Sequence, residues 1–153
     1  MDSLDRAIIH QLVRDGRIAN TELAQRVGLS PSPCLRRVRA LEEAGVITGY
    51  HATVDPAAMG RGLQVLVHAD LADQRQATVE AFEAAVQQVE EIVSCRRMFG
   101  NPDYLLTVAV GGFESYEQLY MGALTALPGV VTTKSQFIMK VVKQEPGHGA
   151  LTT

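Results

Sequence analysis

The chain has 153 residues, enough for one ordinary domain or two small ones, and 46% of them are hydrophobic while 20% are charged. This composition excludes a disordered chain, and no apolar run approaches the roughly 18 residues of a membrane span. The net charge of −3 argues at first against a nucleic-acid partner, but residues 1–50 contain seven Arg against six Asp or Glu. The acidic start lacks the basic segment of a secretory signal, so we expect a cytoplasmic protein.

Apolar residues recur at helical spacing over residues 3–15 and predict a first, supporting helix. Asp2 or Ser3 can cap the start of this helix, and Gly16 marks its end. The predicted apolar face consists of Leu4, Ile8, Ile9, Leu12 and Val13.

A second and a third helix follow, separated by a short turn. Gly28 ends the second helix, because a residue without Cβ adopts the left-handed conformation that a tight turn needs. Ser30 can cap the third helix, and Pro31 can occupy its first position, where no N–H is required. The apolar stripe of the second helix consists of Leu23, Ala24 and Val27.

The third helix has an apolar inner face and a basic outer face. Either Cys34 or Leu35 faces inward, together with Val38 and Leu41. Two helices, a glycine turn and a basic outer face on the second of them predict a helix-turn-helix. The residues left outside are Ser32, Pro33, Arg36, Arg37 and Arg39.

The outer face of the third helix is the predicted DNA-binding surface. Guanidinium groups pair with phosphate and, in the major groove, bidentately with guanine, while free N–H groups at a helix start attract phosphate. The alternative is a charged face that is only solvated, and which Arg reads bases stays open. The predicted DNA-binding residues are Ser30, Ser32, Pro33, Arg36, Arg37 and Arg39.

The segment after the third helix is rich in β-forming residues and then in turn-forming residues. Residues 46–54 predict a short hairpin-like wing or a connecting strand, and residues 55–62 predict a linker with a possible one-turn helix. The expected organisation is a winged helix-turn-helix over 1–50, a linker over 51–62, a second domain over 63–144 and a mobile tail over 145–153.

The second domain alternates strand and helix patterns in the order strand, helix, strand, strand, helix, strand. This order predicts a ferredoxin-like βαββαβ domain, and the chain as a whole is therefore expected to be of the α+β class. The predicted strands are 63–71, 92–99, 104–110 and 131–142, the predicted helices are 76–90 and 114–127, and the turn is 100–103.

A four-stranded sheet with helices on one face leaves its other face open. Apolar residues occur in both registers of the strands, so we expect this open face to be apolar and to be covered by a second copy of the chain. The apolar residues in question are Leu66, Leu105, Val108, Ile138 and Val141.

Three stretches of the chain resemble the Lrp/AsnC transcriptional regulators, the feast/famine proteins. They are LDRAIIHQLVRDGRIANTELAQRVGLSPSPCLRRVRALEEAGVITGY, GNPDYLL at Gly100–Leu106, and LPGVVTTKSQFIMKVVKQ at 127–144. The resemblance implies a winged helix-turn-helix joined to a ligand-sensing domain of ferredoxin-like fold. It also implies homodimers that assemble into octamers, and an amino acid or related metabolite bound between dimers near the GNPDY turn.

The predicted effector site is centred on this turn. Amide groups of the turn can hold a carboxylate and Asp103 can pair with an α-ammonium, although a plain hairpin is the alternative. Thr133 and Ser135 point to one face and can complete the site, or serve as cross-strand partners. The predicted effector-binding residues are Arg97, Met98, Gly100, Asn101, Pro102, Asp103, Tyr104, Phe113, Thr133, Ser135 and Gln136.

Several effector positions depart from the leucine-responsive pattern of the family. Arg97, Phe113 and Gln136 stand where leucine-type members carry apolar or aromatic residues, whereas Asp103 and Tyr104 match. The two polar residues predict a more polar pocket, and an amino acid other than leucine becomes a reasonable effector.

Nothing in the chain predicts catalysis, a metal or another cofactor. The four His lack metal-ligand spacing, no Ser or Cys nucleophile motif is present, and Cys34 and Cys95 are expected to be buried structural thiols. The sequence therefore favours a sequence-specific, effector-responsive transcription regulator. The alternatives are an effector-independent architectural protein that wraps DNA and, further off, the amino-acid-sensing domain of an enzyme.

Overall fold

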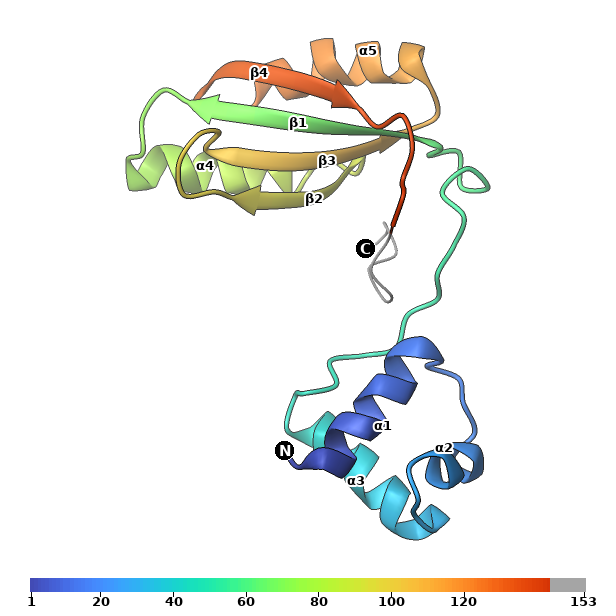
Figure 1. Ribbon diagram of the computed structural model, residues 1–153. Coiled ribbons are helices and arrows are strands. Elements are labelled where there is room, and N and C mark those ends of the chain that lie inside the picture. The colour runs from blue at the N-terminus through green and yellow to red at the C-terminus, as the bar shows by residue number, and fades with distance from the viewer. Residues whose placement is uncertain (144–153) are drawn as a thin grey trace. The chain divides into compact units, whose positions relative to one another are not determined.

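The computed structural model describes residues 1–143, and the predicted mobile tail lies outside these residues (Figure 1). Within the described part, the chain forms two compact units that divide between Thr53 and Val54. The first unit is helical and the second contains a sheet, so the α+β class is confirmed.

The helical unit consists of three helices around a small core. They are α1 (Ser3–Arg14), α2 (Asn20–Arg26) and α3 (Pro31–Glu43). Ile8 from α1, Leu23 from α2 and Val38 from α3 are buried together, as the apolar spacing predicted. Gly28 has φ +72° and forms the turn between α2 and α3.

Three details of this unit differ from the prediction or decide between alternatives. Cys34 is fully buried, whereas Leu35 is exposed, so the inward position belongs to the cysteine. Ser30 occupies the N-cap position of α3 as predicted, but its side chain makes no capping hydrogen bond. Asp2 caps α1 with a capping box shared with Asp5.

The predicted wing or connecting strand at 46–54 is wrong, because no strand occurs between α3 and residue 63. The amides of Val46 and Ile47 donate instead to the carbonyl oxygen of Leu41, which folds the segment back on the end of α3. β-forming residues make a strand only where a partner strand can accept their hydrogen bonds. Residues 56–60 form a turn rather than a helix.

The second unit is a four-stranded antiparallel sheet with two helices on one face (Figure 1). The strand order is β2-β3-β1-β4, which is that of the predicted ferredoxin-like plait. Its elements are β1 (Leu63–Leu71), α4 (Gln76–Val86), β2 (Ile92–Arg97), β3 (Tyr104–Val110), α5 (Phe113–Gly122), the 3₁₀ turn η1 (Leu124–Ala126) and β4 (Val130–Phe137).

The core of this unit lies between the sheet and the two helices. Val65 and Val67 of β1 are fully buried against Phe82 of α4 and Tyr116 of α5. Several predicted elements are shorter in the structure: α4 ends at residue 86, β2 at 97, β4 at 137, and the helix predicted over 114–127 breaks into α5 and η1.

The open face of the sheet is mixed in character rather than apolar, which corrects the prediction. Val108 is fully buried in the core on the helix side. Leu66 and Leu105 alternate with the buried residues of their strands and therefore lie on the open face. Polar or charged residues lie around them on the same face of the sheet, namely Gln64, His68, Asp70, Arg96, Lys134 and Gln136. A second correction concerns Cys95, which is exposed.

Candidate functional site

The outer face of α3 presents two arginines that are free to meet an anion. Arg36 and Arg39 are exposed, and neither forms an ion pair with any residue of the described chain. Ser30 and Ser32 are exposed at the start of the helix, while Pro33 is half-buried. This arrangement offers guanidinium groups and a helix N-terminus to one side, as phosphate binding requires.

Arg37 differs from its two neighbours because it is already paired. Its Nη1 atom lies 2.8 Å from Asp2 Oδ2 and 2.7 Å from Asp5 Oδ1, at the start of α1. These carboxylates raise the pKa of Arg37 above its usual value, with Asp5 the larger contributor. Arg37 was predicted to bind DNA together with Arg36 and Arg39, but in the structure it is half-buried and engaged within the helical unit.

The starts of α2 and α3 are tied together by a side-chain contact. Asn20, the first residue of α2, donates from Nδ2 to the carbonyl oxygen of Pro31 at 2.9 Å. The bond links the N-terminal ends of the two helices, and so helps to set the angle between them.

The turn between β2 and β3, residues 98–103, is held by hydrogen bonds to the end of β1. The amide of Met98 donates to the carbonyl oxygen of Asp103 at 2.8 Å and closes the turn. Asp103 Oδ2 accepts from the amide of Leu71 at 2.8 Å. Asp70 Oδ1 accepts from the amide of Asp103 at 3.3 Å and from Asn101 Nδ2 at 3.2 Å.

Two carboxylates therefore meet at this corner of the sheet. Neither Asp70 nor Asp103 forms an ion pair within residues 1–143, and their only bonded partners there are amide groups. A cation brought to the corner would be attracted by both charges. Sequence reasoning found Asp103 but missed Asp70. The sequence feature that could have indicated Asp70 is an acidic residue near the end of a strand in which every second residue is apolar.

Arg97 and Tyr104 form a second polar cluster with a residue that sequence reasoning missed. Arg97 Nη2 lies 2.5 Å from Glu83 Oε1 on α4, and Arg97 Nε donates to the Tyr104 hydroxyl at 3.0 Å. The Tyr104 ring is only 1% exposed and packs 4.4 Å from the Phe82 ring, centroid to centroid. The hydrogen bond from Tyr104, followed by that from Arg97, lowers the pKa of Glu83 below its usual value of 4.5.

Predicted effector residues of β4 and α5 contact aromatic side chains outside the turn. Ser135 Oγ lies 2.5 Å from the Tyr116 hydroxyl, and Thr133 Oγ1 lies 2.9 Å from the Tyr120 hydroxyl. Both side chains thus share one face, as predicted, but their partners lie on α5 instead of on a neighbouring strand. Phe113 is exposed, with its ring centroid 5.1 Å from that of Phe137.

Gln136 lies on the face of β4 opposite to Thr133 and Ser135, since residues alternate along a strand. The predicted effector residues therefore occupy several surroundings. Only the residues of the turn itself, Met98 and Gly100–Asp103, share one corner with Asp70.

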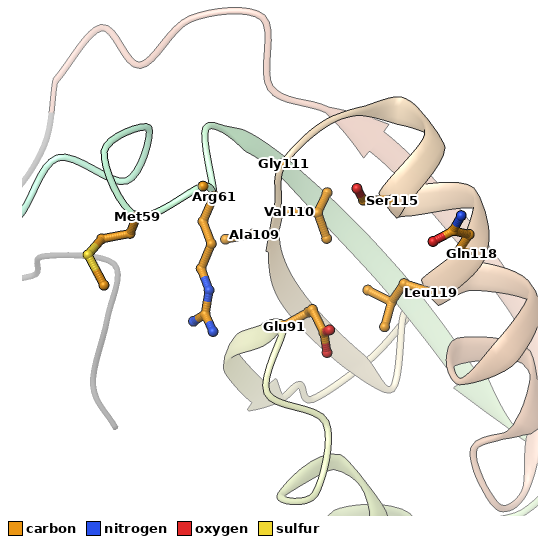
Figure 2. A pocket seen from close by; sticks show the side chains of 10 residues that line it. Met59, Arg61, Glu91, Ala109, Val110, Gly111, Ser115, Gln118 and Leu119 are labelled. Atoms are coloured by element: carbon orange, nitrogen blue, oxygen red, sulfur yellow. The ribbon is translucent and has the colours of Figure 1, made fainter.

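A separate shallow pocket of about 390 Å³ lies beside the N-terminal end of α5. Figure 2 shows Arg61 on one wall and Ser115, Gln118 and Leu119 of α5 on the other. Arg61 is paired with Glu90. No predicted effector residue lines this pocket, so it is distinct from the turn.

The described residues contain no group of three or more side chains placed to hold a metal ion. Over the same part of the chain, no helix has the length and apolar character needed to cross a membrane. A helix-turn-helix with exposed arginines on its second helix defines a DNA-binding protein, and here it is joined to a separate plait domain.

Comparison with known proteins supports this class at both ends of the chain. Residues 1–48 match a family described as winged helix-turn-helix DNA-binding, and residues 64–147 match the Lrp/AsnC ligand binding domain. The leucine-responsive regulatory proteins of Salmonella typhimurium and Klebsiella pneumoniae are 44% identical over 144 residues, which cover 94% of this chain and 88% of each relative. The chain belongs to the Lrp/AsnC family of transcription regulators.

Solved structures agree with this assignment. A transcriptional regulator from Neisseria meningitidis in complex with L-Met is 34% identical, with a TM-score of 0.90 over 95% of this chain and 94% of that one. An AsnC family transcriptional regulator from Agrobacterium tumefaciens is also 34% identical, with a TM-score of 0.89 over the same shares. The predicted fold and the predicted DNA-binding regulator function are thereby confirmed.

Proposed function

We propose that this regulator binds DNA through the exposed face of α3, and that an α-amino acid held at the 98–103 turn changes its DNA binding or its assembly. The observation that carries the effector site is the pair of carboxylates of Asp70 and Asp103, which have only amide donors as partners within residues 1–143. An α-ammonium supplies the positive charge that this corner lacks, and forms charge-assisted hydrogen bonds there.

The turn also offers apolar surface for the side chain of an effector. Met98 is 43% exposed and Phe99 is fully exposed, directly beside the acidic corner. Arg97, which suggested a polar pocket, is engaged with Glu83 and does not present a free charge. We therefore propose an effector with an apolar side chain, such as methionine or leucine, and the L-Met complex of the Neisseria regulator supports this choice.

A thermal-shift screen of the full chain against the 20 L-amino acids tests the proposal. We expect methionine or leucine to raise the Tm, because a ligand at about 100 times its Kd adds roughly 2.7 kcal/mol of stability. N-acetyl-L-methionine is the matched control, since it keeps the side chain and the carboxylate but lacks the α-ammonium. The proposed site is wrong if no amino acid raises the Tm, or if the acetylated compound raises it equally.

The mode of action that we propose is binding without catalysis, in the cytoplasm, by homodimers that assemble further into octamers. Leu66 and Leu105 on the open sheet face, and exposed apolar side chains at and after the end of β4, support an interface in the second unit. A gel-shift titration with and without the amino acid identified by the screen tests the response of DNA binding.

A further inference from the structure

We infer that Arg37, although it lies on the DNA-reading helix, is a positioning residue that holds the start of α1 against α3 and does not contact DNA. The inference rests on the proposed role of α3 in DNA binding. The arginines of that helix then have different roles, since Arg36 and Arg39 meet the DNA while Arg37 maintains the helical unit.

The geometry of the contact supports a structural role. One guanidinium nitrogen of Arg37 reaches two carboxylates on a different helix, 32 and 35 residues away in the chain. The side chain of Asp5 is only 16% exposed and that of Arg37 only 34%, so the contact is partly shielded from water. Arg36 and Arg39 are exposed and have no such partner within residues 1–143.

The capping box of α1 explains why a cation is needed at this place. The Asp2 amide donates to Asp5 Oδ2 at 2.8 Å, and the Asp5 amide donates to Asp2 Oδ1 at 2.9 Å. This reciprocal arrangement caps the helix but brings two negative charges close together, and like charges repel. The positive charge of Arg37 lies close to both carboxylates and reduces this repulsion. The amide bonds together with Arg37 keep the pKa of each carboxyl below its usual value.

The two carboxylates also make Arg37 a poor partner for a phosphate. Both are bound by its Nη1 atom, so any phosphate that approached this guanidinium would meet two negative charges beside one positive charge. The net charge at this place therefore repels DNA, and we infer that Arg37 keeps its contact with Asp2 and Asp5 when α3 binds DNA.

The salt dependence of DNA binding by the full chain separates the two roles. Each lost phosphate contact reduces the slope of log Kobs against log salt by about 0.9. We expect Arg36→Ala or Arg39→Ala to weaken DNA binding without changing the Tm. At least one of these two variants should also show this reduction of the slope. Arg37→Ala should lower the Tm of the helical unit and weaken binding, but should keep the wild-type slope.

Removing all charges of the contact at once provides the decisive variant. Asn retains the capping ability of Asp, so Asp2→Asn and Asp5→Asn combined with Arg37→Ala should recover most of the Tm and of the DNA affinity, with the wild-type slope. The same variant keeps the test informative if Arg37→Ala alone fails to fold. Arg26→Ala, which removes an arginine paired with Glu22 on α2, is the matched control and should keep both the affinity and the slope.

A slope reduced by about 0.9 in the triple variant would overturn the inference, because it would show that Arg37 neutralises a phosphate. An unchanged Tm in Arg37→Ala would overturn it as well. If the proposed role of α3 in DNA binding is wrong, the result is different: both Arg36→Ala and Arg39→Ala then bind DNA with wild-type affinity.

Discussion

The hydroxyl group of the buried Tyr104 donates a 2.9 Å hydrogen bond to Glu83 Oε1, and so connects the first residue of β3 with α4. Arg97, the last residue of β2, binds the same carboxylate oxygen at 2.5 Å. The two strand ends that flank the 98–103 turn are thus anchored to one glutamate. The base of the turn is therefore bound to α4, while Phe99 at its tip is exposed.

The Glu83 contact predicts a dependence of stability on pH. The pKa of Glu83 is lower in the folded protein than its usual value of 4.5, so its contribution is complete above that value and is lost as the pH falls through the lowered pKa. We expect Glu83→Gln to lower the Tm near neutral pH and to flatten its decline on acidification. Glu80→Gln, which removes a carboxylate of α4 with no ion pair among residues 1–143, is the control. Parallel Tm curves for wild type and Glu83→Gln would contradict the prediction.

Changes at the acidic corner should affect the effector and not DNA binding. Loss of a charge-assisted pair costs roughly 1.5–3 kcal/mol, or about ten- to a hundredfold in affinity. We expect Asp103→Asn and Asp70→Asn each to raise the Kd for the amino acid by this factor, measured from the ligand dependence of the Tm, with unchanged basal DNA affinity. Asp73→Asn is a suitable control, because Asp73 bonds to Arg75 and Thr78 away from the turn. An unchanged ligand titration in both corner variants would show that the carboxylates do not bind the effector.

Gly129 is the glycine of the second unit with the least room for a side chain. It has φ +75°, and a Cβ atom there would lie 2.5 Å from Thr78 Cγ2. We expect Gly129→Ala to lower the unfolding free energy by more than about 1 kcal/mol, measured by denaturant titration. Adding Thr78→Ser should restore part of the loss, because it removes the methyl group and keeps the hydroxyl that bonds Asp73 at 2.8 Å. Equal stability of the single and double variants would mean that the steric contact is unimportant and only the backbone conformation matters.

The open sheet face should carry the dimer interface. We expect light scattering of the full chain to give a multiple of the 16.6 kDa chain mass, and Leu66→Arg to reduce that mass, because a buried charge opposes association. Met121→Arg, on an exposed position of α5, is the control and should leave the mass unchanged. A monomeric wild-type chain at micromolar concentration, or an unaffected Leu66→Arg variant, would rule out this interface.

Features that depend on neighbours in the sequence could be predicted from it. The bounds of β1 and β3 agree with the predicted 63–71 and 104–110, and Cys34, Val38 and Leu41 of α3 face inward at helical spacing. Periodicity and turn residues act within a few positions, so a local pattern contains the information. The quoted motifs likewise sufficed to predict the Lrp/AsnC family, which the comparisons confirm.

Which side chains meet across elements was decided by the tertiary structure alone. Arg37 and Arg97 look like free basic residues in the sequence, but folding brings Asp5 to the first and Glu83 to the second. Alternation places Thr133 and Ser135 on one face, yet only the packing of α5 decides that tyrosine hydroxyls meet them there. The β-forming segment at 46–54 has no partner strand and stays irregular. A sequence pattern states which face of an element is apolar, but an ion pair, a hydrogen bond or a strand needs a partner whose position only the folded chain determines.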